Sequence, residues 1–152
     1  METAYPRPQL RRAQWLPLDG PWRFRFDDPC EWSHPAGIAH WPLQIQVPYP
    51  PESEASGVGD RGFHKACWYQ RDFELVPGGD RVLLRFGAVD YSARVWVNGS
   101  LAVTHEGGHT PFAADITDQR CKTTPKTIGS LPTTYNWLRA SSRTKNARLN
   151  LE

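Results

Sequence analysis

The segment His105-Glu106-Gly107-Gly108-His109 is the first candidate for chemistry, because it matches the zinc-protease pattern H-E-x-x-H. In that pattern two histidines four positions apart share one helix face and hold zinc, while the glutamate acts as a general base. Here each of the two adjacent glycines lowers helix stability by about 1 kcal/mol relative to alanine. A strand-like run precedes the segment and Pro111 follows it closely. We therefore expect a turn after a strand, with no metal site and no cofactor.

Carboxylates are the second candidate, since glycoside hydrolysis needs two of them about 5–5.5 Å or about 6.5–9.5 Å apart. Asp72 and Glu74 alternate with apolar residues in a strand-like run, which indicates a solvated strand face. Asp115 stands before Ile116 and Thr117 and is interpreted as a turn former. The sequence assigns no carboxylate pair, and it contains no nucleophile elbow, P-loop or dinucleotide fingerprint.

Aromatic side chains are the remaining group that could bind a ligand. The flat face of an exposed Trp or Tyr covers the apolar side of a pyranose while polar neighbours take its hydroxyls. The chain has 7 Trp and 5 Tyr, and most aromatic side chains in a domain of this size belong to the core. The candidate substrate-binding residues are Trp68, Tyr69, Tyr91, His105 and Glu106.

Alternating sequence runs predict the strands that must position these residues. Large apolar side chains recur at every second position, as in a sheet with one buried face. Asn98-Gly99 predicts a hairpin, because both central residues of a type I′ turn need positive φ. The expected strands are 22–26, 41–47, 67–76, 81–86, 92–97, 100–105 and 111–116, with a long loop over 48–62. Without a convincing helix, this pattern predicts an all-β antiparallel jelly roll or β-sandwich.

Length and composition limit the class of protein. A chain of 152 residues makes one ordinary domain, and its 14 Pro and 12 Gly exclude a helical bundle. No apolar run approaches the roughly 18 residues of a membrane helix, so we expect a soluble protein with no membrane partner. Three cysteines without a C-x-x-C pair indicate reduced thiols and a cytoplasmic location.

The charge distribution sets the last part of the chain apart. Residues 118–152 hold seven Lys or Arg and two Asp or Glu, a net charge of +5, whereas the preceding part carries −3. Nothing in that acidic part indicates a nucleic-acid partner. We divide the chain into an N-terminal arm at 1–14, a jelly roll at 15–117 and a basic tail at 118–152, which we expect to be disordered.

Several of these runs together resemble the N-terminal sugar-binding domain of glycoside hydrolase family 2. The segments that carry the resemblance are LDGPW at 18–22, VPY at 47–49, WYQRDF at 68–73, VLLRFGAVDYSARVWVNG at 82–99, HEGGHTPF at 105–112 and DIT at 115–117. The family includes β-galactosidases, β-glucuronidases and β-mannosidases. The resemblance implies a galactose-binding-like jelly roll that binds carbohydrate.

The resemblance ends at about residue 118, and this departure affects the expected activity. In the family the domain precedes an immunoglobulin-like sandwich and a (β/α)₈ barrel that carries the catalytic glutamates, and such a barrel takes about 250 residues. No position here matches a catalytic residue, so we expect the chain alone to be inactive. It would then support a glycosidase, with a separately encoded catalytic segment as one candidate partner. The alternatives are an independent carbohydrate-binding module and an inactive remnant of a truncated or frame-shifted gene.

Overall fold

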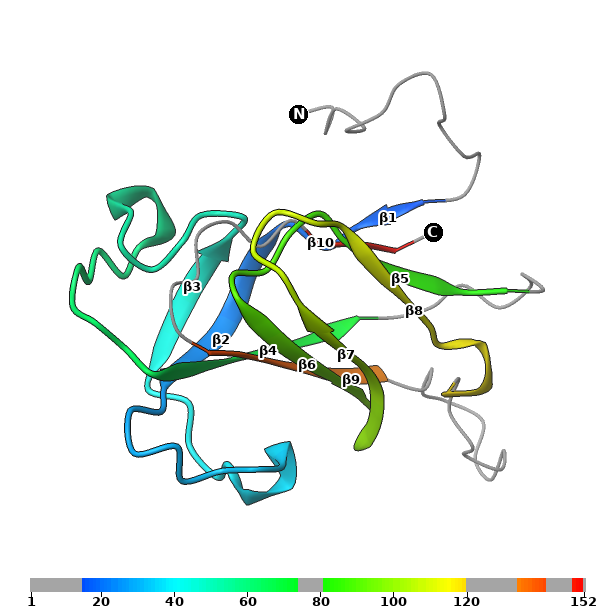
Figure 1. The fold of residues 1–152 in the computed structure, drawn as a ribbon, viewed down its shortest axis with the longest axis horizontal. Coiled ribbons are helices and arrows are strands. Elements are labelled where there is room, and N and C mark those ends of the chain that lie inside the picture. The colour runs from blue at the N-terminus through cyan, green and yellow to red at the C-terminus, as the bar shows by residue number, and fades with distance from the viewer. Residues whose placement is uncertain (1–14, 74–80, 120–133, 142–148, 152) are drawn as a thin grey trace, which may run out of the picture.

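The computed structural model describes residues 15–73, 81–119, 134–141 and 149–151, and it shows two antiparallel sheets (Figure 1). The strands are β1 (Leu16–Pro17), β2 (Gly20–Phe26), β3 (Leu43–Val47), β4 (Ala66–Phe73), β5 (Leu83–Phe86), β6 (Ser92–Val97), β7 (Ser100–Glu106), β8 (Phe112–Asp115), β9 (Thr134–Ser141) and β10 (Leu149–Leu151). In these described residues the connections contain the 3₁₀ turns η2 (Pro35–Gly37), η3 (Glu54–Ser56) and η4 (Thr117–Gln119).

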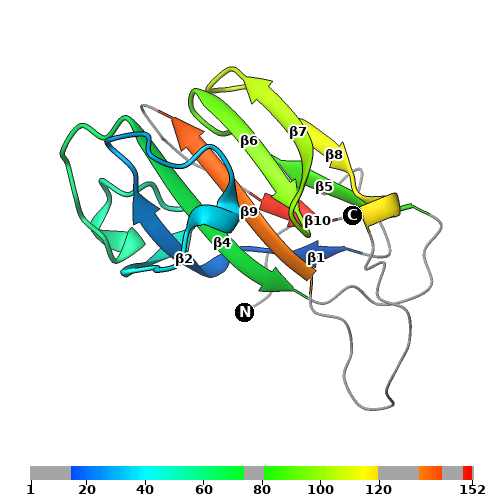
Figure 2. The same ribbon diagram turned by 90° about the horizontal axis from the view of Figure 1, so that it is seen from below.

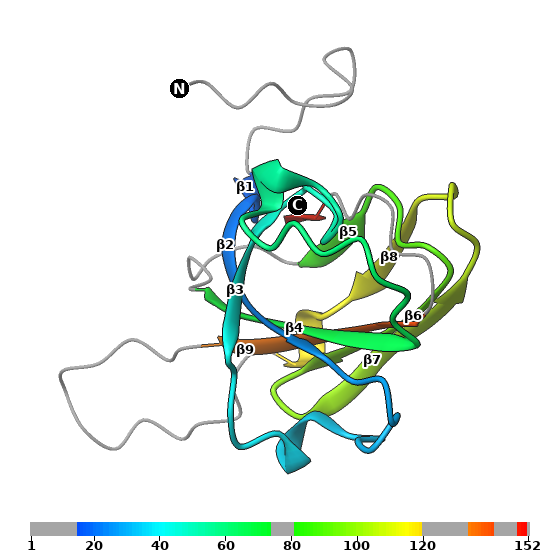
Figure 3. The same cartoon turned by 90° about the vertical axis from the view of Figure 1, so that its left-hand side faces the viewer.

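The two sheets form the layers of a sandwich (Figure 3). The larger sheet has the strand order β3-β2-β4-β9-β6-β7, and the smaller one has the order β1-β10-β5-β8. The Asn98-Gly99 hairpin pairs Val97 with Ser100, and Asn98 has a φ of 50° as a type I′ turn requires. The predicted all-β sandwich is confirmed.

The main core lies between the sheets and follows the alternation of the strands. Phe24 and Tyr69 from the larger sheet meet edge to face, with ring centroids 4.9 Å apart. Leu84 and Phe86 of β5 and Ile116 after β8 bury their side chains against the same cluster. One face of each of β2, β3, β4, β5, β6 and β8 therefore supplies this core.

A second apolar cluster covers the opposite face of the larger sheet. Trp68 of β4 and Trp96 of β6 lie with ring centroids 5.3 Å apart, next to Ile38. The connection from β2 to β3, which carries η2, runs along this face of the sheet (Figure 3). Its Trp32 and Trp41 pack against the cluster. The central strands of this sheet are thus covered on both faces.

The basic tail differs from the expectation of disorder in two segments. β9 lies between β4 and β6, and β10 lies between β1 and β5 (Figure 2). The sequence of β9 has no regular apolar period. A strand on each side nevertheless satisfies the backbone N–H and C=O groups of β9. The rest of the tail beyond residue 119, and the predicted arm at 1–14, lie outside the described residues.

Two further observations bear on the composition arguments. In the part of the chain that the structure describes, no helix is long and apolar enough to cross a membrane. Cys30 is exposed and Cys67 is buried, and no disulfide joins them. Cys121 lies outside the described residues.

Candidate functional site

Three of the five predicted site residues come together where β6 and β7 lie side by side. His105 and Glu106 end β7, and the register places them opposite Ala93 and Ser92 of β6. Tyr91 directly precedes β6, and its carbonyl oxygen accepts a 2.8 Å hydrogen bond from the Gly107 amide. This bond ties the connection after β7 to the connection before β6.

The two glycines of the H-E-x-x-H match make this close approach possible. Gly107 has a φ of +131°, a conformation that L side chains rarely adopt. A Cβ on Gly108 would lie 2.5 Å from Asp90 Oδ1, closer than van der Waals contact allows. The segment is a turn that follows strand β7, as the sequence analysis expected, and it has no shared helix face for two histidines.

Within this cluster, Tyr91 and Glu106 face solvent while His105 is held in place. Tyr91 is 54% exposed, and Glu106 is exposed as well. The His105 ring stacks on Phe112 with centroids 4.2 Å apart, and its Nε2 lies 3.0 Å from Thr110 Oγ1. Tyr91 and Glu106 are therefore an exposed aromatic ring and an exposed carboxylate at the same end of β6 and β7, groups that can meet the apolar face and the hydroxyl groups of a sugar.

The other two predicted site residues lie inside the molecule. Trp68 is 0% exposed and Tyr69 is 1% exposed. Adjacent residues of a strand point to opposite faces, and both faces of β4 are covered. The Trp68 indole N–H donates to buried Asp27 over 3.0 Å. Neither ring has a free face on which a sugar could stack, so we carry only Tyr91, His105 and Glu106 forward.

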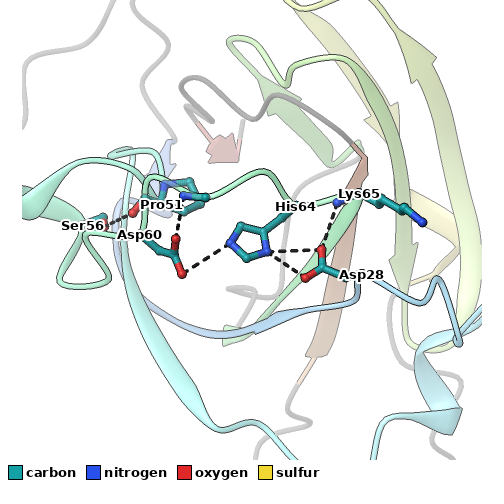
Figure 4. Close-up of polar contacts among 7 residues, drawn as sticks. Asp28, Pro51, Ser56, Asp60, His64 and Lys65 are labelled. Atoms are coloured by element: carbon teal, nitrogen blue, oxygen red, sulfur yellow. Dashed lines mark hydrogen bonds and ion pairs between the residues drawn. The ribbon is translucent and has the colours of Figure 1, made fainter.

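The sequence analysis did not find a second polar cluster, which is centred on His64 (Figure 4). The His64 imidazole lies between two carboxylates, with Nδ1 3.0 Å from Asp28 Oδ2 and Nε2 3.4 Å from Asp60 Oδ2. The ring stacks on Phe26 at a centroid distance of 3.5 Å. The cluster therefore joins the end of β2 and the residues just after it to the loop before β4.

Backbone hydrogen bonds hold both carboxylates of this cluster in position. Asp28 Oδ1 accepts from the Lys65 amide over 3.0 Å, and Asp60 Oδ1 accepts from the Gly62 amide over 2.7 Å. The Asp60 amide in turn donates to the Pro51 carbonyl over 2.9 Å (Figure 4). The hydrogen bond from His64 lowers the pKa of Asp28, and the Gly62 amide, followed by His64, lowers the pKa of Asp60.

A small pocket lies beside this cluster. Its lining includes Phe26, Glu52, Phe63 and His64, and its volume is about 70 Å³. Small-molecule sites typically measure roughly 300–1,000 Å³, so this pocket is too small to enclose a sugar. We interpret the His64 cluster as a structural contact that holds the loop before β4 against the residues after β2. Its partners Asp28 and His64 are 36 positions apart, and no sequence pattern connects them.

The described residues also contain no group of three or more His, Cys, Asp or Glu side chains that could hold a metal ion. His105 and Glu106 therefore have no third ligand nearby in this part of the chain. The site on β6 and β7 can offer a ligand stacking on the Tyr91 ring and hydrogen bonds to the Glu106 carboxylate.

Comparisons with known proteins agree on one family. The model of the family "Glycosyl hydrolases family 2, sugar binding domain" matches residues 29–123. The β-glucuronidase of the dog, Canis lupus familiaris, is 38% identical over 126 residues, which cover 74% of this chain and 19% of that protein. The chain thus spans about a fifth of the length of the curated relatives it matches.

Solved structures give the same result. A β-glucuronidase of Faecalibacterium prausnitzii matches 91% of this chain and 22% of its own, with a TM-score of 0.67 and 29% identity. A β-glucuronidase of Bifidobacterium dentium, solved in complex with coumarin-3-O-glucuronide, matches 84% of this chain and 20% of its own, with a TM-score of 0.66 and 27% identity. These likenesses cover most of the chain and agree with the resemblance seen in the sequence.

Proposed function

Because the chain belongs to glycosyl hydrolase family 2 through its sugar-binding domain, we propose that it supports and shapes the glucuronide site of a β-glucuronidase-type glycosidase. The observation that carries this proposal is the 38% identity to a β-glucuronidase over most of the chain. A β-glucuronidase solved with a bound glucuronide, which has the same fold, supports the same substrate class. The catalytic groups would come from outside the described residues.

We assign the contact with the sugar, or with the sugar-bound catalytic segment, to the exposed end of β6 and β7. Tyr91 would cover an apolar sugar face, and Glu106 would accept hydrogen bonds from hydroxyl groups. His105 would act as a positioning residue, since its ring already stacks on Phe112 and lies against Thr110. The hydrogen bond from the Gly107 amide to the Tyr91 carbonyl holds together the backbone segments that carry these side chains.

A domain exchange tests this proposal. The full chain replaces the matching segment of the Faecalibacterium prausnitzii enzyme, and hydrolysis of 4-nitrophenyl β-D-glucuronide is compared with hydrolysis of the galactoside. We expect the chimera to hydrolyse the glucuronide preferentially, and we expect Tyr91→Ala in the chimera to lower kcat/KM about tenfold. The matched control is Tyr49→Ala, since Tyr49 is an exposed tyrosine far from β7 along the chain. A folded chimera without glucuronide hydrolysis, or equal effects of the two substitutions, would contradict the proposal.

The exposure of Tyr91 and of Glu106 at the same end of β6 and β7 also favours an independent carbohydrate-binding module as a second candidate. Amide chemical shifts of the isolated chain separate the two functions. Shifts at residues 91 and 105–110 on titration with methyl β-D-glucuronide would favour the independent module. Glucuronide hydrolysis by the chimera, without such shifts in the isolated chain, would favour the supporting role.

A further inference from the structure

The pocket beside His64 is lined by buried polar atoms that lack partners. Glu52 Oε2 and His64 Nε2 are both buried, and neither makes a hydrogen bond in the part of the chain that the structure describes. Asp60 also lines the pocket and places its Oδ2 3.4 Å from His64 Nε2, an ion-pair contact without hydrogen-bond geometry (Figure 4). An unpaired buried polar atom costs free energy, and a bound ligand that pairs with it removes this cost.

The atoms that face this pocket are hydrogen-bond acceptors. His64 Nδ1 lies 3.0 Å from Asp28 Oδ2. Because a carboxylate only accepts, Nδ1 carries the hydrogen and Nε2 of the neutral ring keeps a lone pair. Glu52 and Asp60 supply two further acceptors, since both are carboxylates. The pocket therefore fits a ligand that carries several donors and a positive charge.

An ammonium group has these properties, with three N–H donors and no acceptor. A metal ion does not fit as well, because no group of His, Cys, Asp and Glu among the described residues could hold one. The cationic residues of the adjoining loop do not occupy the site. The Lys65 side chain points away from His64 (Figure 4), and neither Lys65 nor Arg61 lines the pocket.

The size and walls of the pocket select an ammonium group on a narrow stem. Its volume of about 70 Å³ leaves room for a few water-sized groups and excludes a pyranose ring. Phe63 lines the pocket and is 72% exposed. An exposed ring of this kind contacts methylene groups and attracts a cation. The ammonium of lysine is compact, whereas the guanidinium of arginine is a wider plane.

We propose that this pocket binds the ε-ammonium group of a lysine side chain on a partner protein. Glu52, Asp60 and His64 accept its hydrogen bonds, and the Phe63 ring contacts its methylene groups. The partner would then lie against the loop before β4, which carries Asp60 and Phe63. The inference uses no sugar contact and does not depend on the proposed function.

Titration of the isotope-labelled full chain with Nα-acetyl-lysine N-methylamide tests this inference. At pH 7.5 the lysine probe is charged and an ordinary histidine is mostly neutral. We expect saturable shifts of the amide signals of Gly62, Phe63 and His64. Glu52→Gln removes the charge and should weaken binding about tenfold. Glu54→Gln is the matched control, because Glu54 is exposed and does not line the pocket, and it should bind as the unaltered chain does.

Three further probes of the unaltered chain decide the question even where the Glu52→Gln chain does not fold. The norleucine analogue lacks the ammonium group, the arginine analogue carries a guanidinium, and methyl β-D-glucosaminide is an amino sugar. Tighter binding of the lysine probe than of all three supports the proposal. The proposal is overturned by an absence of saturable shifts, by equal binding of the norleucine analogue, by tighter binding of the arginine analogue or the amino sugar, or by equal affinities of the folded Glu52→Gln and Glu54→Gln chains.

Discussion

Asp27 is a buried carboxylate that organises the outer tryptophan cluster. Its side chain is 0% exposed. Oδ2 accepts from the Trp68 indole over 3.0 Å, and Oδ1 accepts from the Glu31 amide over 2.8 Å. The residue thus joins β4 to the connection that leads into η2. Removal of the carboxylate would take this acceptor away from both the Trp68 indole and the Glu31 amide.

We predict that Asp27→Ala lowers the free energy of unfolding by about 1–3 kcal/mol, the cost of leaving a buried donor unsatisfied. Urea unfolding followed by circular dichroism measures the change. Asp27→Asn, which keeps one acceptor oxygen, should lose less. Glu31→Ala is the control, since Glu31 is exposed and only its amide contacts Asp27. An Asp27→Ala chain as stable as that control would contradict the assigned role.

Gly108 is the residue on which the shape of the candidate site depends. A Cβ there meets Asp90 Oδ1 at 2.5 Å and Asp90 Cγ at 2.8 Å. We predict that Gly108→Ala lowers stability by about 1–3 kcal/mol through overpacking. Adding Asp90→Ala should recover part of this loss, because the clashing atoms are removed. Thermal unfolding of the single and double variants checks the prediction, and strictly additive losses would show that the two positions do not interact.

The connection from β8 into η4 is an element that acid should loosen. Asp115 Oδ1 accepts from the Thr117 hydroxyl over 2.6 Å, and Oδ2 lies 2.6 Å from Arg81 Nε before β5. The Thr117 hydroxyl, followed by Arg81, lowers the pKa of Asp115 from 3.8 to about 2. A lowered pKa means that the ionised form stabilises the fold, so this stabilisation is complete above the unfolded value of 3.8 and is lost as the pH falls toward 2.

We predict that the melting temperature of the unaltered chain falls more steeply between pH 4 and pH 2 than that of Asp115→Asn. Near neutral pH the variant should be the less stable of the two, because the contacts with Thr117 and Arg81 are weakened. Differential scanning calorimetry over this range measures both effects. Asp118→Asn provides an exposed control on the same turn. Parallel pH curves for Asp115→Asn and the unaltered chain would contradict the prediction.

Elements with strong local patterns could be predicted from the sequence. The β2 strand follows from its alternation of aromatic residues and arginines, and the β6–β7 hairpin follows from Asn98-Gly99. β9 could not be predicted, because its position is set by the two strands that flank it and not by a period of its own. Trp68 and Tyr69 were expected near a ligand because exposed aromatic rings can stack on a sugar. The structure instead buries Trp68 under the β2–β3 connection and Tyr69 in the core between the two sheets, which no local pattern in the sequence shows.

At the scale of the whole molecule, the chain covers about a fifth of its curated relatives. We predict that the purified chain alone does not hydrolyse chromogenic β-glucuronides, β-galactosides or β-mannosides, because no residue in it matches a catalytic position of the family. A host lacking its own glycosidases provides the control preparation. Turnover above that control would mean that carboxylates such as Glu106 form a catalytic site, and it would contradict the supporting role.

The Trp68–Trp96 pair gives the larger sheet an optical reporter. The two indoles are carried by β4 and β6, yet their centroids lie only 5.3 Å apart at an interplanar angle of 30°. Two transition dipoles this close and mutually rotated couple as an exciton, which produces paired bands of opposite sign in the far-ultraviolet circular dichroism spectrum. Since β9 separates the strands that carry the rings, the couplet follows the spacing of β4 and β6 in real time. Stopped-flow detection of this signal would show whether the sheet closes before or after the rest of the chain folds.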